Sequence, residues 1–200
     1  MRFLATKVFV LALSLNAIAM FVGADASRAD SKSNLSKLGA GAAEVTLIDT
    51  LNKPVKWKTF KGQKRVLFFG FTHCPVVCPV TVWEIDAALN DIGSAANVIK
   101  ILFVTLDPAR DTSAALAKYF LGFNGRVLAH TGAPTEIAQL AKSFNITFQR
   151  VDTSKGEYTI DHTATAFLID ADGKVVDTLA FGASRETSVS RLKALLSGPK

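Results

Sequence analysis

Sulfur is scarce in this 200-residue chain, which contains two cysteines and two methionines. Both methionines, Met1 and Met20, lie in the N-terminal segment, so the rest of the chain has no thioether with which to form a methionine-rich metal site. The two cysteines, Cys74 and Cys78, lie in one stretch, GFTHCPVVCP, and each is followed by proline. Any thiol chemistry of this protein is therefore confined to one short loop.

The patterns typical of nucleic-acid binding are also missing. The sequence has no zinc-finger spacing, no glycine-rich phosphate loop and no stripe of basic residues. The net charge of +6 comes from charges scattered along the chain, as on an ordinary solvated surface. We expect no nucleic-acid partner, while a basic surface would suit an anionic membrane or an acidic protein.

The N-terminal segment has the pattern of an export signal. Arg2 and Lys7 precede an apolar run over residues 8–24, and Ala24-Asp25-Ala26 has the small residues of a cleavage site. The run is shorter than the ~20 residues that a membrane span needs. We therefore expect residues 1–26 to be an export signal, with an uncleaved membrane anchor as the alternative. No cysteine lies near the cleavage site, which excludes a lipid anchor there. The expected location is the periplasm, either soluble or tethered to the inner membrane.

The segment after the export signal is small and polar, and rich in Gly and Ala. This composition predicts a flexible linker over residues 27–43. The folded domain is then expected over residues 44–200, a length that can bury a sizeable core.

From residue 44 onward the apolar pattern predicts alternating strands and helices. Residues 44–49 and 53–60 alternate like paired strands, which predicts an N-terminal β-hairpin. Continuous apolar runs over 64–71 and 97–106 predict strands buried on both faces. The helical spacing between these two runs completes a right-handed βαβ unit.

The second half of the chain predicts a short edge strand, RVLAH, between helices around Leu116 and Ile137. A hairpin over 165–181 that turns at Asp172-Gly173, followed by a closing helix around Leu192, predicts a complementary ββα unit. A βαβ half joined to a ββα half predicts an α/β, thioredoxin-like fold, with a central mixed β-sheet flanked by helices and the extra N-terminal hairpin.

This topology brings distant residues to one edge of the sheet. The hairpin strand that begins near Thr165 runs antiparallel to the strand that ends at Phe71, so the start of one lies beside the end of the other. We therefore expect His162 to neighbour the cysteine loop. Asp107, which follows the second parallel strand, should share that edge.

The cysteine loop leads directly into a helix. Pro79 lacks an amide hydrogen and disfavours helical conformation at Cys78, which predicts Cys78 at the helix cap and Pro79 in the first turn. The helix N-terminus would then favour the thiolate form of both cysteines. A purely structural disulfide is disfavoured because so short a loop constrains the unfolded chain little. A redox pair and a metal site remain.

A metal site needs a further ligand, and the chain offers three imidazoles. His162 is favoured by its place opposite the thiols. His73 adjoins Cys74 where neighbouring side chains diverge, and His130 ends the predicted edge strand. Two thiolates and one imidazole suit copper, whereas zinc usually takes a fourth ligand.

The sequence also departs from the thioredoxin pattern itself. Thioredoxins carry a cis-proline that faces their cysteine pair, just before the corresponding hairpin strand. Here no proline lies between Pro134 and Pro199, and Asp161, His162 and Thr163 occupy that neighbourhood. An open site of three ligands is suited to passing a metal on.

Four blocks of the sequence resemble the Sco (SenC) family in that family's order and spacing: FFGFTHCPVVCP, VTLDPARDT, HTGAPTEIAQLAKSF and DHTATAFLID. The similarity covers about residues 44–198. The family consists of thioredoxin-fold copper proteins that assist assembly of the binuclear copper centre of cytochrome c oxidase. The resemblance implies that Cys74, Cys78 and His162 bind copper as Cu(I) or Cu(II). It also implies a partner, oxidase subunit II or a related copper acceptor.

One residue departs from the family pattern, and several neighbours have two interpretations. Val76 stands where the family loop usually has Asp, which removes no ligand but leaves the individual partner open. Asp107 either supports the site or is a turn residue. Asp111 and Thr112 are expected to cap the following helix. Asp161 would orient the imidazole in an irregular segment and diverge from it in an extended one.

The sequence thus predicts an exported copper chaperone rather than an enzyme. Copper would pass by ligand exchange to its acceptor, and a disulfide between Cys74 and Cys78 would block binding. The alternative is a thiol-disulfide reductase that keeps the acceptor's copper-binding cysteines reduced, with Cys74 and Cys78 as its redox-active pair and a thiol-reducing partner of its own. A redox or copper sensor that signals by docking is a third interpretation.

Overall fold

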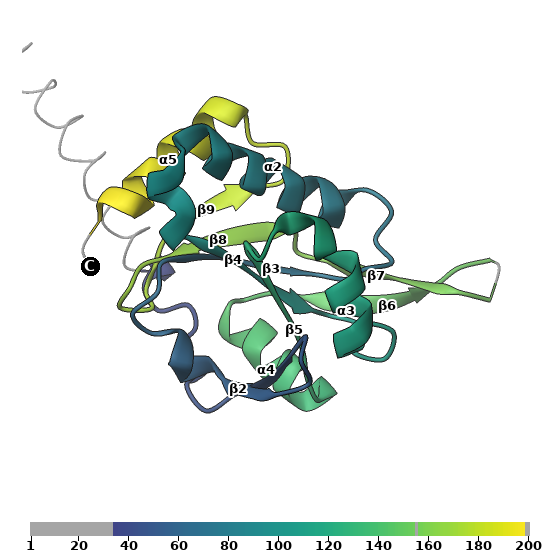
Figure 1. Ribbon diagram of the computed structural model, residues 1–200. Helices are drawn as coiled ribbons and strands as arrows, with labels where there is room; N and C mark the ends of the chain where they lie inside the picture. The colour runs from purple at the N-terminus through teal and green to yellow at the C-terminus, as the bar shows by residue number, and fades with distance from the viewer. Residues whose placement is uncertain (1–33, 155, 199–200) are drawn as a thin grey trace, which may run out of the picture.

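The computed structural model describes residues 34–154 and 156–198. In this part of the chain a central β-sheet is covered by helices on both faces (Figure 1). None of the helices in these ranges has both the length and the apolar character needed to cross a bilayer. The predicted export segment, residues 1–26, lies outside the described residues.

Seven strands form the central sheet in the order β2-β1-β5-β4-β3-β8-β9. Their bounds are β1 Thr46–Asp49, β2 Pro54–Lys56, β3 Arg65–Gly70, β4 Lys100–Thr105, β5 Val127–Thr131, β8 Thr165–Ile169 and β9 Val175–Ala180. Strands β3, β4 and β5 run parallel, whereas β1, β8 and β9 pair antiparallel with their neighbours. The predicted mixed sheet with an N-terminal hairpin is confirmed.

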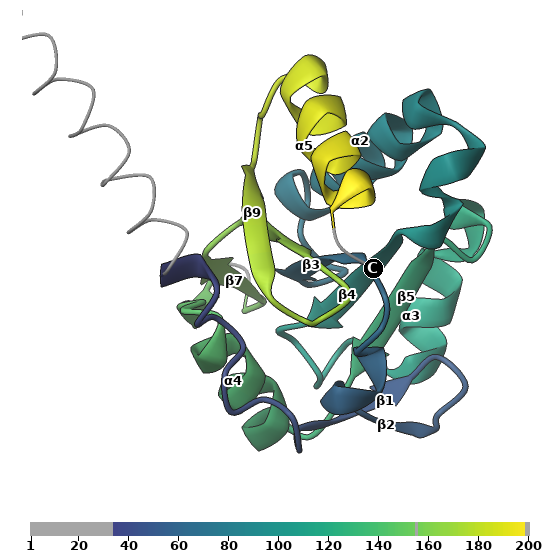
Figure 2. The same cartoon turned by 90° about the vertical axis from the view of Figure 1, so that its left-hand side faces the viewer.

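In the described ranges, α-helices and short 3-10 segments lie between the strands, and α5 follows the last strand. Their bounds are η1 Trp57–Phe60, α2 Val77–Ile92, η2 Ser94–Val98, α3 Ser113–Tyr119, η3 Leu121–Phe123, α4 Pro134–Ser143 and α5 Arg185–Ser197. Helices α2 and α5 lie side by side over one face of the sheet, and α4 covers the opposite face (Figure 1 and Figure 2). With helices on both faces, the central strands are shielded from water.

Burial on both faces explains the composition of the central strands. Every residue of β3 is buried, and so are five of the six residues of β4. The apolar stripe of α2, with Val82, Ile85 and Leu89, packs onto the sheet. The predicted strands over 64–71 and 97–106 are thus confirmed, although β4 starts only at Lys100 because Ser94–Val98 forms η2.

Two expectations about strands are wrong. The strand expected over residues 53–60 ends at Lys56, because Trp57 and Phe60 turn into the core as η1, with their rings 5.6 Å apart. Strand β5 is not an edge strand, because β1 returns from the N-terminal hairpin and pairs with it.

Part of the segment expected to be a linker packs against the domain. The amide of Gly39 donates to the carbonyl of Ser143 at 2.8 Å, and Ala42 is fully buried. Leu35 and Leu38 are partly buried against the core. The packed domain therefore begins before residue 44.

A second, two-stranded sheet has no counterpart among the predicted elements. It is the hairpin of β6 Phe148–Asp152 and β7 Tyr158–His162, which pairs with no strand of the central sheet. Figure 1 shows it extending away from the body of the domain. The alternation in YTIDH is a weak sequence signal that could have indicated a strand here. Since β7 ends at His162, this hairpin positions the candidate imidazole.

Candidate functional site

The end of β3 places Cys78 in the core. Gly70 is the last residue of this strand, and a Cβ atom there would lie 3.0 Å from the sulfur of Cys78. The missing side chain therefore makes room for the sulfur. Cys78 is 1% exposed, whereas Cys74 is partly exposed at the start of the loop.

Helix α2 begins two residues earlier than the sequence indicates. Its N-cap is Val76, so Cys78 lies in the first turn together with Pro79 rather than at the cap. Val76 has no side-chain oxygen to accept a helix amide. The sulfur of Cys74 accepts one instead, from the backbone N–H of Cys78 at 3.3 Å. This sulfur therefore lies at the positive end of the helix dipole.

His162 faces the buried thiol, which confirms the predicted proximity. Its Nε2 atom is 3.5 Å from the sulfur of Cys78. Its Nδ1 atom lies 3.0 Å from the carbonyl oxygen of Thr163, and because a carbonyl oxygen only accepts, Nδ1 carries a proton. In the neutral ring, Nε2 then presents its lone pair to the sulfur.

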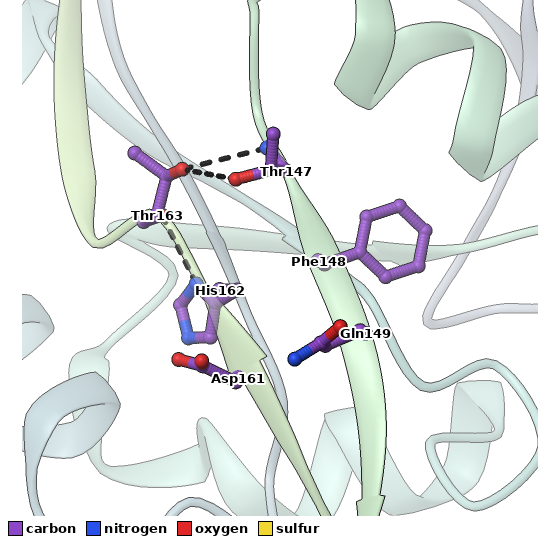
Figure 3. Close-up of a pocket in the computed structure, with 6 residues that line it drawn as sticks. All are labelled: Thr147, Phe148, Gln149, Asp161, His162 and Thr163. Atoms are coloured by element: carbon purple, nitrogen blue, oxygen red, sulfur yellow. Dashed lines mark hydrogen bonds between the residues drawn. The ribbon is translucent and has the colours of Figure 1, made fainter.

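The surroundings hold the imidazole in place. Phe68 and Phe71 lie edge-on to the ring, with centroids 6.4 Å and 5.9 Å away. On the next residue, Thr163 donates its backbone N–H to the carbonyl of Thr147 at 3.0 Å, and the two hydroxyls are 3.2 Å apart. Figure 3 shows the contact between the two hydroxyls and the bond of His162 to Thr163. The residues drawn there line a hollow of about 430 Å³.

Burial favours the neutral forms of both groups. It raises the pKa of the Cys78 thiol well above its usual range, and the neighbouring Cys74 adds to the rise. Burial lowers the pKa of His162, although its bond to Thr163 opposes this. The expectation that the helix N-terminus favours the thiolate at both cysteines is therefore wrong for Cys78, because desolvation outweighs the helix dipole there.

Tyr119 belongs to these surroundings, and no sequence signal predicted it. Its pKa is raised to about 12, first by burial and then by the charges of Cys78 and Cys74. The phenol lies at the end of α3 and is partly buried.

Asp111 has a different role from the predicted helix cap. Thr112 alone caps α3, accepting the amide of Ala115 at 3.2 Å. Asp111 is fully buried and accepts the backbone N–H of Thr72 at 3.0 Å and its hydroxyl at 2.5 Å. It also accepts the hydroxyl of Thr105 at 2.6 Å. Asp111 thus ties the start of the cysteine loop to the end of β4.

The two acidic residues with open roles are both kept from direct contact with the thiols. Asp107 shares the predicted sheet edge, but its carboxylate binds Arg110 and the hydroxyl of Tyr158. Asp161 is exposed on the extended strand β7 and makes no hydrogen bond with His162 among the described residues. Its carboxylate nevertheless acts on the imidazole through its charge, which partly offsets the lowering of the His162 pKa by burial.

The other two histidines lie elsewhere. His73 is about half exposed, and its Nδ1 is 3.1 Å from the hydroxyl of Thr72. His130 is buried in β5, where it bonds the carbonyl of Leu128 and packs edge-on against Phe60. Neither histidine is hydrogen-bonded to a cysteine in the part of the chain described.

The site is thus a thiol–imidazole pair with a second thiol beside it. Both cysteines are free, and within residues 34–154 and 156–198 no three side chains of His, Cys, Asp or Glu are already gathered around a metal position. Cys78 and His162 are in contact, and the Cys74 sulfur accepts the backbone N–H of Cys78.

A thioredoxin-like sheet with two cysteines after β3 and a histidine facing them defines the class of protein. A family model described as SCO1/SenC matches residues 36–197. Since this match covers most of the chain, the chain belongs to the SCO1/SenC family.

Curated relatives and solved structures agree with this membership. Protein sco1 of Schizosaccharomyces pombe is 32% identical over 145 residues, covering 70% of this chain and 55% of that protein. The mitochondrial SCO2 homolog of Bos taurus is 30% identical over 155 residues, covering 76% and 58%. The chain therefore spans little more than half the length of these relatives.

Two solved structures of similar proteins are described as having copper bound. Bradyrhizobium japonicum ScoI has a TM-score of 0.68 and 36% identity, covering 76% of this chain and 96% of that one. Yeast Sco1 has a TM-score of 0.70 and 26% identity, covering 78% and 88%. Both are similar to this chain over its folded domain.

Proposed function

We propose that this protein is a copper metallochaperone. It binds Cu(I) or Cu(II) through Cys74, Cys78 and His162 and delivers the ion to the binuclear copper centre of cytochrome c oxidase. The contact between the Cys78 sulfur and His162 Nε2 carries the proposal. The copper-bound structures of two similar proteins support the choice of metal.

The geometry fits two ligands of one ion. Metal–sulfur and metal–nitrogen bonds of about 2.3 and 2.0 Å, meeting near the tetrahedral angle, place the two ligand atoms about 3.5 Å apart. The observed separation is 3.5 Å. Nε2 offers a lone pair without losing a proton, so only the thiols must be deprotonated when the ion binds.

The unequal exposure of the thiols suits transfer by ligand exchange. Cys74 is partly exposed at the helix N-terminus, while Cys78 is buried. An ion that leaves would first exchange Cys74 for a ligand of the acceptor and then release Cys78 and His162. The acceptor in this proposal is oxidase subunit II or a related copper protein. The export segment would place the exchange in the periplasm, with the chain soluble or tethered to the inner membrane.

A thiol-disulfide reductase is the second candidate, favoured by the free state of both cysteines. The accessible thiolate of Cys74 would attack a partner disulfide and release one partner thiol. Cys78 would then displace the second partner thiol, leaving a Cys74–Cys78 disulfide. A thiol-reducing partner would restore the dithiol form. This activity needs both sulfurs but not the imidazole.

The variant His162→Ala separates the two functions. Copper affinity, measured anaerobically by competition with a chelator of known affinity, is expected to fall by roughly 100-fold or more, because a ligand is lost. The rate of reduction of a model disulfide should stay close to that of the wild type.

His73→Ala is the matched control, because it removes a half-exposed imidazole that contacts Thr72 and Asp111 and makes no hydrogen bond to a cysteine among the described residues. It is expected to change neither property. If His162→Ala binds copper as tightly as the wild type, the three-ligand chaperone proposal is wrong.

A further inference from the structure

The hairpin of β6 and β7 carries a proposed copper ligand but is joined to the rest of the domain by few elements. It pairs with no strand of the central sheet, and its base, near His162, adjoins β8. Ile160, in the middle of β7, is buried in the core. Tyr158 lies at the other end of β7, opposite Asp152. The contacts of Tyr158 therefore hold the outer end of the hairpin against the domain, beyond the point that Ile160 holds.

Tyr158 is bonded to a fixed point of the body. Its hydroxyl donates to Oδ1 of Asp107 at 2.8 Å. Asp107 is 4% exposed, and its own backbone N–H donates to the hydroxyl of Thr105 at the end of β4 at 2.9 Å. A buried carboxylate on the rigid sheet thus holds the phenol of the hairpin.

Arg110 binds both members of this pair. Its Nε atom donates to the carboxylate of Asp107, and its Nη1 atom donates to the backbone carbonyl of Tyr158 at 3.0 Å. Its guanidinium carbon also lies 3.6 Å from the centre of the Tyr158 ring, and that of Arg150 on β6 lies 3.9 Å away. The two cation–π contacts and three hydrogen bonds make one connected unit.

We propose that Asp107, Arg110 and Tyr158 form a hairpin latch that positions His162 against Cys78. The latch sets the tilt of β7 and thereby the direction of the imidazole. Its opening lets His162 turn away and makes release of copper faster. The three residues are positioning residues, since none of them contacts the thiols. This inference rests on the proposed copper function.

The variant Tyr158→Phe tests the latch by removing only the hydroxyl, while the ring stays between the arginines. The rate at which the copper-loaded protein gives its ion to excess chelator is expected to rise about 10- to 100-fold, the factor for a lost hydrogen bond to a charged group. In the metal-free protein, the NMR signals of the His162 ring should shift and broaden. Amide hydrogen exchange should quicken within residues 148–162.

A purely structural effect gives a different result. If the hydroxyl only stabilised the fold, its loss would also change the rate of disulfide exchange at the cysteines. The latch predicts that this rate stays unchanged. Thr159→Val is the matched control, because it replaces a hydroxyl on the same strand that makes no hydrogen bond among the described residues. This control is expected to match the wild type in every measurement.

Arg110→Lys provides a second test, because lysine keeps the charge but cannot bond Asp107 and the Tyr158 carbonyl together. Like Tyr158→Phe, it should make the release of copper faster. In the double variant, the effect should be smaller than the sum of the two single effects. Wild-type transfer rates and unchanged His162 signals in Tyr158→Phe would overturn the latch. A wild-type protein that binds no copper would instead contradict the proposed function, and the signals of the metal-free ring would still decide on the latch.

Discussion

Gly70 is the residue on which the packing of the buried thiol depends most directly. A side chain there would meet the ring of Phe103 at 2.9 Å, the sulfur of Cys78 at 3.0 Å and the ring of Phe68 at 3.1 Å. None of these neighbours is free to move far, because all three are buried. The absence of a Cβ atom is therefore a condition for the contact between Cys78 and His162.

Gly70→Ala is expected to destabilise the domain by roughly 1–3 kcal/mol, as overpacking does in other cores. It should also push the Cys78 sulfur away from His162 and lower the copper affinity. Urea unfolding and chelator competition measure the two effects. Gly122→Ala is the control, because nothing lies within 4 Å of its added methyl group, and its stability should stay within about 0.5 kcal/mol. Equal stability of the two variants would contradict this account of Gly70.

Local sequence also misleads at single residues. The Asp-Thr pair at 111 and 112 has the composition of a helix cap, and Thr112 does cap α3. Asp111 instead bonds Thr72, which is 39 positions earlier in the chain. A propensity rule considers only neighbours in sequence, so it could not predict that partner.

At the scale of elements, the cysteine loop is held by its connection to the end of β4. Asp111→Ala would leave three donors of Thr72 and Thr105 without their acceptor. We expect a loss of about 3 kcal/mol or more of unfolding free energy and faster reaction of Cys78 with a thiol reagent. Thermal unfolding and thiol labelling measure these changes.

Asp91→Ala serves as the control for this experiment. It removes a carboxylate from a half-exposed ion pair with Arg185, so its stability should change by no more than about 1 kcal/mol. Labelling of Cys78 at the wild-type rate in Asp111→Ala would show that the loop does not depend on this anchor.

The predicted elements were accurate where periodicity is strong and failed where tertiary contacts compete. The long apolar run of β3 and the helical stripe of α2 are unambiguous. The short hairpin of β6 and β7 is mostly exposed and weakly patterned. Residues 57–60 look like a strand in sequence, but two aromatic rings draw them into the core.

At the scale of the whole molecule, the first described residues extend the core. Residues 34–43 lie on α4, where Gly39 approaches the ring of Phe144 and Ala42 is buried. In a chain starting at residue 44, the end of α4 would no longer be covered by residues 34–43. The expected result is a melting temperature lower by roughly 5–10 °C than that of a chain starting at residue 34.

Calorimetry of the two shortened chains and of the full chain measures this difference. The chain starting at residue 34 should melt like the full chain, which makes it the control for removal of residues 1–33. Identical melting of all three would mean that residues 34–43 contribute nothing to the domain and that residue 44 is its functional boundary.

The sequence by itself determined the α/β order of elements, the confinement of both thiols to one loop and the approach of His162, because periodicity and strand direction are local properties. Only the tertiary structure decided that Cys78 is buried as a neutral thiol, that Asp111 anchors the loop and that Asp107 holds the hairpin. Burial and hydrogen bonding depend on partners such as Tyr158, 51 positions from Asp107, which meet only when the whole chain has folded.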